Sequence, residues 1–138
     1  MSRFTCQKSL KNSKMGMVAS VSLPAGISCP TDIPCFKACY AAKIERIYKN
    51  TKNAYVHNWE LWQDNESLYF ESINDFLKYY GGISFRWHVS GDIPNYSYLS
   101  NMVNLASKHN HIKFLCYTKN YNLVNRFISE NGPLPENL

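Results

Sequence analysis

The sequence predicts an α/β fold built on a small three-stranded parallel sheet, and three observations lead to this prediction. Short stretches rich in β-branched and aromatic residues lie at about 15–23, 83–89 and 112–117. Turn-forming or polar residues follow each stretch, and between the stretches the apolar residues recur with helical spacing. Strands that alternate with helices are typical of a parallel sheet with right-handed crossovers.

The predicted elements follow in the order βαβαβα, with additional helix in the first crossover. Helical periodicity covers about 35–50, 54–63, 67–80, 96–109 and 122–129. We expect the polar residues 50–53 to break the chain between the first two helices, and the pair Gly81-Gly82 to end the third.

One domain accounts for the length of 138 residues. We expect residues 1–14 to form an N-terminal arm and residues 15–138 to form the βα core, with a helical insertion at about 50–80. Hydrophobic residues make up 45% of the chain and aromatic residues 14%, which is typical of an ordered globular protein.

Composition also limits where the protein works. No apolar run approaches the length of a membrane span, so we expect no membrane association. The first residues contain no apolar signal core, and five cysteines would leave one unpaired if disulfides formed. We therefore expect a cytoplasmic, reducing location.

The net charge of +5 is unevenly distributed. Residues 1–52 hold nine Lys or Arg and two acids, whereas residues 53–138 hold six Lys or Arg and eight acids. A basic surface of this kind suits nucleic acid or phosphate, although these lysines form no compact run and a solvated basic face also accounts for them.

Three of the five cysteines fall within eleven residues, with the spacing C-x5-C-x3-C. If Pro34 opens a helix, Cys35 and Cys39 project from one face of it, and Cys29 folds back over them. A helix N-terminus favours the thiolate, the form of cysteine that binds metal. The pattern indicates a metal or iron–sulfur loop; buried structural cysteines are the alternative.

The choice of metal depends on the number of ligands. Structural zinc sites usually pair two short C-x2-4-C knuckles, and no second pair exists here. Three clustered cysteines suit a cluster with one iron left open, while zinc with a distant fourth ligand remains the less favoured reading. Cys116 and Cys6 are candidate fourth ligands.

All three predicted strands end in loops with chemically capable residues. The cysteines follow the first strand, Ser90-Gly91-Asp92 the second, and Thr118-Lys119-Asn120 the third. Parallel strands bring such loops to one edge of the sheet, where α/β proteins place their sites.

Within the second loop, Gly91 permits close approach to the backbone, and Asp92 offers a carboxylate for an ammonium group or for ribose hydroxyls. A cap of the following helix, by Asp92 or Asn95, is the structural alternative. Lys119 in the third loop suits a carboxylate or phosphate. Strict alternation places His88 on the face of Arg86, either as a hydrogen-bonded core group or as a ligand.

Several of these residues also carry a resemblance. Ser22–Gly26, Cys29, Cys35, Cys39–Ala41, His88–Asp92 and Tyr117–Lys119 resemble the phage gene-product-eighty-eight family over about residues 18–128. A more distant resemblance is to the radical S-adenosylmethionine (SAM) iron–sulfur enzymes.

The second resemblance implies a truncated half-barrel in which Cys29, Cys35 and Cys39 hold a [4Fe-4S] cluster. It implies that Ser90, Gly91 and Asp92 bind the methionine amino group of SAM at the open iron, and that the loop of Lys119 lies near the nucleoside. Which residues are catalytic stays unknown, and whether the protein is an enzyme stays open.

The alternative is a non-enzymatic phage protein, stapled by an iron–sulfur cluster or zinc, that regulates or binds nucleic acid. In either case a three-stranded sheet leaves open edges, so we expect a homodimer or a partner protein to cover them.

Overall fold

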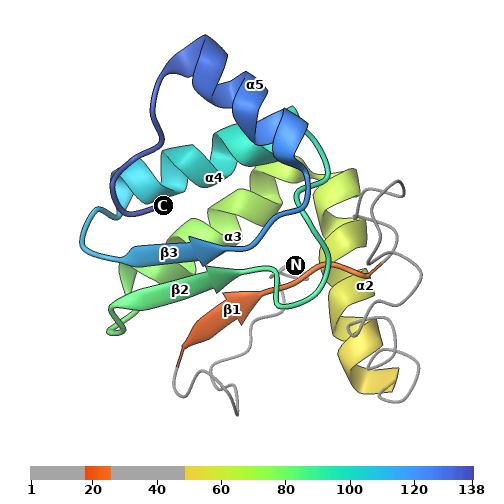
Figure 1. The fold of residues 1–138 in the computed structure, drawn as a ribbon. Helices are drawn as coiled ribbons and strands as arrows, with labels where there is room; N and C mark the ends of the chain where they lie inside the picture. Colours follow the sequence, from red (N-terminus) through yellow and green to blue (C-terminus); the bar gives the residue numbers. More distant parts are fainter. Residues whose placement is uncertain (1–17, 26–48) are drawn as a thin grey trace.

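The computed structural model describes residues 18–25 and 49–138. Within these ranges one sheet contains β1 (Ala19–Val21), β2 (Ser84–Trp87) and β3 (Lys113–Cys116). The strands are parallel in the order β1-β2-β3, and their arrows in Figure 1 point to the same side. The predicted three-stranded parallel sheet is therefore confirmed.

The described helices are α2 (Lys49–Asp64), α3 (Glu66–Lys78), α4 (Tyr96–Lys108) and α5 (Tyr121–Asn131). Both α2 and α3 lie between β1 and β2, so the first crossover carries the predicted additional helix. None of these four helices is sufficiently long and apolar to cross a membrane.

The break predicted at 50–53 is wrong, because α2 runs through these residues. Asparagine, threonine and lysine are weaker helix formers than alanine, but none of them prevents a helix. The same helix buries Asn58 and Leu61 further along, and such packing outweighs a weak local preference. The predicted arm at 1–14 and most of the helix predicted at 35–50 lie outside the described residues.

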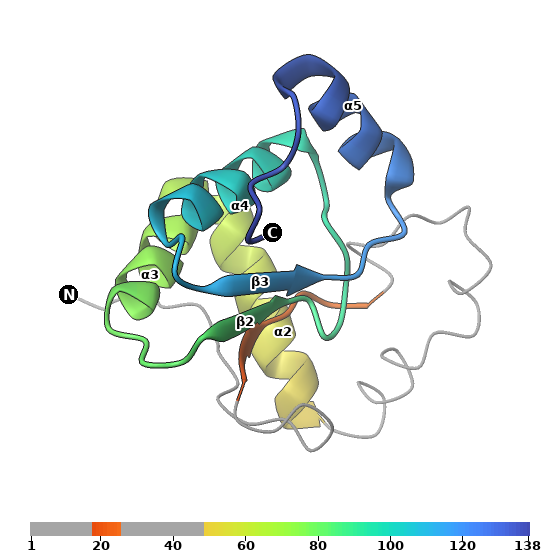
Figure 2. The same ribbon diagram turned by 60° about the vertical axis from the view of Figure 1, so that its left-hand side comes forward.

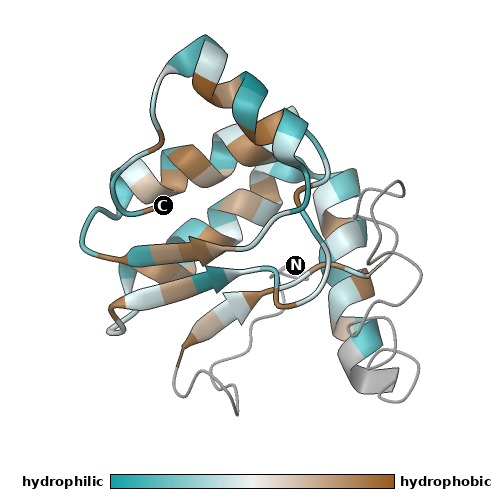
Figure 3. Cartoon of the chain, viewed as in Figure 1, coloured by the Kyte–Doolittle hydropathy of each residue, from teal (hydrophilic) through white to brown (hydrophobic). Residues whose placement is uncertain are grey.

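Helices α3 and α4 lie side by side along one face of the sheet (Figures 1 and 2). Phe85 and Trp87 of β2 point to this face, where the ring of Trp87 lies 6.4 Å from Phe70 of α3 and 6.1 Å from Tyr98 of α4. The hydrophobic residues in Figure 3 gather on the strands and on these two helices. The core thus fills the space between the sheet and one helical layer.

Side-chain caps fix where α3 and α4 begin. Asn65 accepts a hydrogen bond from the Leu68 N–H at 3.0 Å, and Asn95 accepts one from the Tyr98 N–H at 2.9 Å. Each cap satisfies one of the N–H groups that a helix leaves unpaired at its start. The positive φ of 85° at Gly132, which follows α5, suits glycine.

Hydrogen bonds from outside the sheet reach both outer strands. The Tyr80 hydroxyl accepts from the Ala19 N–H of β1 at 3.1 Å and donates to the Ser84 carbonyl at 2.7 Å. On the other edge, the Phe114 N–H of β3 donates to the Asn137 carbonyl at 2.7 Å. Tyr80 and the C-terminal segment therefore each provide a hydrogen-bond acceptor for a backbone N–H group of an outer strand.

Candidate functional site

The described end of β1 is hydrogen-bonded to the loop that follows β2. The Ser22 hydroxyl accepts from the N–H groups of Val89 at 3.1 Å and Ser90 at 3.3 Å. The Leu23 N–H donates to the Ser90 carbonyl at 3.1 Å, and Asn58 of α2 donates to the Ser22 carbonyl at 2.8 Å. The carboxyl ends of β1 and β2 therefore form one connected unit with α2.

Asp92 joins the loop after β2 to the loop after β3. Its Oδ1 accepts from the Ile93 N–H at 2.7 Å and from the Thr118 hydroxyl at 2.5 Å, and its Oδ2 accepts from the Lys119 N–H at 2.8 Å. A carboxylate offers about four lone-pair positions, so these three bonds occupy most of its capacity. Asp92 is buried, and its hydrogen bonds hold the two loops together.

The neighbouring residues support the same geometry. Gly91 has a φ of 81°, a left-handed conformation that favours glycine. Asn95 caps α4, so of the two expected cap residues it is Asn95 that takes this role. Asn120 donates to the Ile93 carbonyl at 3.2 Å, adding a second link between the loops. The predicted meeting of the second and third loops at one edge is confirmed.

His88 lies on the opposite side from the one that strict alternation predicts. Its φ is 56°, and this left-handed backbone directs the ring toward α4, where Nε2 lies 2.9 Å from the Tyr98 hydroxyl. Tyr98 in turn lies 2.6 Å from the Tyr69 hydroxyl. A positive φ interrupts the alternation of a strand, which explains the error.

The His88 ring is buried, and burial lowers its pKa from 6.5 to about 3, so the imidazole is neutral. With Nε2 bonded to Tyr98, Nδ1 is buried without a hydrogen-bond partner among the described residues. An unsatisfied buried nitrogen costs stability and is therefore rare unless it has a use.

Cys116 lies in β3 opposite Trp87 and is partly buried. Burial, with a smaller contribution from the charge of Asp92, raises the pKa of its thiol to about 12. Cys116 is therefore protonated at neutral pH, unlike the thiolates that bind metal. Cys6, Cys29, Cys35 and Cys39 lie outside the described residues, and residues 18–25 and 49–138 contain no group of three His, Cys, Asp or Glu able to hold a metal ion.

A pocket of about 600 Å³ opens beside the end of β3 and the start of α5. Seven residues line it, namely Cys116, Tyr117, Thr118, Lys119, Tyr121, Val124 and Asn125. Lys119 thus donates its backbone N–H to Asp92 and also lines the pocket. Tyr117 and Tyr121 were not predicted as site residues; the alternation of Lys113, Leu115 and Tyr117 along the strand is the signal that points to the first of them.

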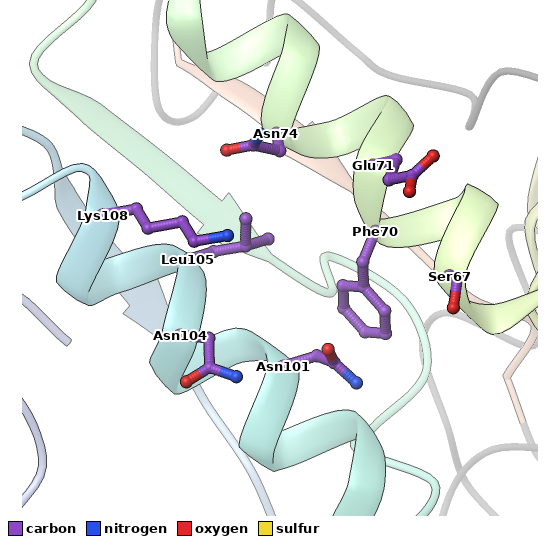
Figure 4. Close-up of a pocket in the computed structure, with 8 residues that line it drawn as sticks. All are labelled: Ser67, Phe70, Glu71, Asn74, Asn101, Asn104, Leu105 and Lys108. Atoms are coloured by element: carbon purple, nitrogen blue, oxygen red, sulfur yellow. The ribbon is translucent and has the colours of Figure 1, made fainter.

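A second hollow, of about 220 Å³, lies between α3 and α4 (Figure 4). Its lining is mostly polar and comprises Ser67, Phe70, Glu71, Asn74, Asn101, Asn104, Leu105 and Lys108. Some of these groups already have internal partners: Asn74 lies 2.8 Å from His109 Nε2, and Asn101 donates to Glu66 at 3.1 Å. The loops of the candidate site contribute nothing to this groove.

Comparison with known proteins identifies the family. The family model described as Gene product 88 matches residues 3–138, nearly the whole chain. The chain belongs to the gene product 88 family. This confirms the first resemblance, whereas the comparisons do not show the resemblance of this gene product 88 chain to radical-SAM enzymes.

Two relatives come from mycobacteriophages. The Gene 88 protein of Mycobacterium phage D29 is 31% identical over 120 residues, covering 78% of this chain and 50% of the relative. The Gene 88 protein of Mycobacterium phage L5 is 30% identical over 120 residues with the same coverage. The gene product 88 chain thus spans about half the length of these curated relatives. No solved structure matches it.

Proposed function

We propose that this gene product 88 chain is an iron–sulfur protein in which Cys29, Cys35 and Cys39 hold a [4Fe-4S] cluster at the carboxyl edge of the sheet. The observation that carries the proposal is the parallel register, which brings the ends of β1, β2 and β3 to one edge. The cysteine-rich segment follows β1 from that edge.

Chain length limits how far the first cysteine lies from the edge. Ala25 is the last described residue after β1, and Cys29 follows four residues later. A fully extended chain advances at most about 3.6 Å per residue, so the Cys29 Cα lies within about 14 Å of the Ala25 Cα. We propose that this short connection lets Cys29 reach the loops that Ser22 and Asp92 connect.

One observation among the described residues supports a metal centre at this edge. The three proposed cysteine ligands themselves lie outside the described residues. His88 directly follows β2, and its buried Nδ1 has no hydrogen-bond partner within residues 18–25 and 49–138. Cys116, by contrast, is a protonated thiol packed against the core, which favours the three clustered cysteines as the ligands.

The finer proposal is a radical-SAM-like enzyme with a half-barrel related to that family. A cluster with an open iron would supply an electron to bound SAM, as the cofactor's own chemistry. Ser90 and Gly91 would then line the methionine end, and Lys119 the nucleoside end. Asp92 supports this less well than the sequence indicates, because most of its carboxylate is already bonded within the protein.

Anaerobic purification followed by iron and sulfide analysis tests the cluster. We expect about four irons and four sulfides per chain, and loss of the cluster in each of Cys29→Ala, Cys35→Ala and Cys39→Ala. Cys116→Ala is the matched control and should retain it. Zinc in place of iron, or full iron retention in the three variants, would overturn the proposal.

Electron paramagnetic resonance of the reduced protein separates the two levels of the proposal. A cluster signal that changes when SAM is added supports an open iron and the enzymatic reading. A cluster signal that SAM leaves unchanged would support the iron–sulfur cluster and overturn the radical-SAM assignment.

A further inference from the structure

The face of β3 that points away from the helical layer is exposed. Phe114 and Cys116 point to the core side, so Lys113 and Leu115 point to the other side, with Tyr117 continuing the alternation. Leu115 is 41% exposed and Tyr117 69% exposed. The exposed face of β3 thus carries two large apolar side chains in one row.

A second exposed aromatic ring stands beside this row. Tyr121, the first residue of α5, is 58% exposed and lines the 600 Å³ pocket together with Tyr117 and Lys119. The two rings therefore flank one hollow at the junction of β3 and α5. Rings of this kind offer flat faces on which a planar group can stack.

Positive charge accompanies the rings. The Arg86 guanidinium lies 5.5 Å from the centre of the Tyr117 ring, and exposed lysines stand at positions 113 and 119. The carboxylate in the adjoining loop, Asp92, is buried and hydrogen-bonded. The first turn of α5 also lacks an acidic residue, so its N-terminal partial charge is not offset there.

We propose that the surface formed by Arg86, Lys113, Leu115, Tyr117, Lys119 and Tyr121 binds single-stranded nucleic acid. Unstacked bases provide the planar groups for the two tyrosines, and the phosphates provide negative charge for the two exposed lysines, with Arg86 adding to the positive potential. A duplex does not fit this chemistry, because its bases are stacked on one another. None of the six residues is a proposed cluster ligand, so this proposal does not depend on the iron–sulfur cluster; Lys119 is shared with the finer SAM-binding proposal.

Fluorescence anisotropy with short labelled oligothymidylate and oligouridylate tests this surface at low salt. Tyr117→Ala and Tyr121→Ala should each weaken binding about 5- to 150-fold, the range for loss of one stacking ring. Tyr117→Phe retains the ring and should bind almost normally. Tyr79→Ala is the matched control, because Tyr79 is 89% exposed, ends α3 and is not one of the six residues of this surface.

Salt dependence tests the phosphate contacts separately. Lys119→Ala should reduce the slope of log affinity against log salt by about 0.7, whereas Lys108→Ala, on α4, should leave it unchanged. The proposal is overturned if neither oligonucleotide binds, if duplex DNA or a free mononucleotide binds as tightly, or if Tyr79→Ala weakens binding as much as Tyr117→Ala.

Discussion

The Asp92 carboxylate and the Thr118 hydroxyl, 26 residues apart in sequence, are joined by a hydrogen bond of 2.5 Å. Together with the Lys119 N–H, this bond fixes the loop after β3 against the loop after β2. Asp92 therefore has a structural role. It sets the positions of the two loops that any ligand at this edge would contact.

Asp92→Ala should lower the free energy of unfolding by about 2–4 kcal/mol, because it leaves the Ile93, Thr118 and Lys119 donors without their acceptor. Urea denaturation measures the change. Asp75→Ala is the control: its ion pair with Lys78, at 3.8 Å, is on the surface, and its loss should lower the free energy of unfolding by less than about 1 kcal/mol. Equal losses of unfolding free energy in the two variants would contradict this structural role of Asp92.

The buried His88 ring should make stability depend on pH. Its pKa is about 3 in the folded state and about 6.5 when exposed, so the unfolded chain binds the additional proton between these values. This contribution is fully present above about pH 6.5 and is lost at up to about 1.4 kcal/mol per pH unit as the pH falls toward 3.

Urea denaturation of wild type and His88→Gln across this window isolates the effect from that of the acidic residues. The difference in unfolding free energy between the two proteins should change steeply with pH below about 6.5. A constant difference would show that His88 is not buried in its neutral form.

The two adjacent glycines before β2 should differ in their tolerance of alanine. A Cβ at Gly82 would clash with the end of the Tyr80 ring, whereas a Cβ at Gly81 meets nothing within 4 Å. Gly82→Ala should displace the Tyr80 hydroxyl from Ala19 and Ser84 and cost about 1–3 kcal/mol.

Gly81→Ala is the matched control and should be neutral or stabilising by up to about 1 kcal/mol, because it restricts the unfolded chain. Thermal unfolding of the two variants compares them directly. Tyr80→Phe should lower stability as Gly82→Ala does; if it is neutral, the hydroxyl bonds are not the cause.

Cys116 should resist alkylation in the folded protein. Its pKa of about 12 leaves almost no thiolate at neutral pH, and the side chain is partly buried. Iodoacetamide labelling followed by peptide mass spectrometry should find Cys116 unmodified in buffer and modified in urea. Rapid modification of the folded protein would restore Cys116 as a candidate metal ligand.

Much of the fold followed from local sequence patterns. The strands around Phe85 and Phe114 and helices α3, α4 and α5 lie where apolar periodicity places them, because each buries one face against the same core. The meeting of the loops after β2 and β3 followed from the parallel order alone. The weak helix formers at 50–53 misled the prediction, since their propensities are small compared with packing.

The sequence by itself determined the α/β class, the parallel sheet and the polar loops at its carboxyl edge, because periodicity and turn residues are local properties. Only the tertiary structure decided the roles of individual side chains. It turned His88 toward Tyr98 through a positive φ, joined Asp92 to Thr118 by a hydrogen bond, and left Tyr117 and Tyr121 exposed in the lining of one pocket. These outcomes depend on contacts between residues far apart in the chain, which no local pattern contains.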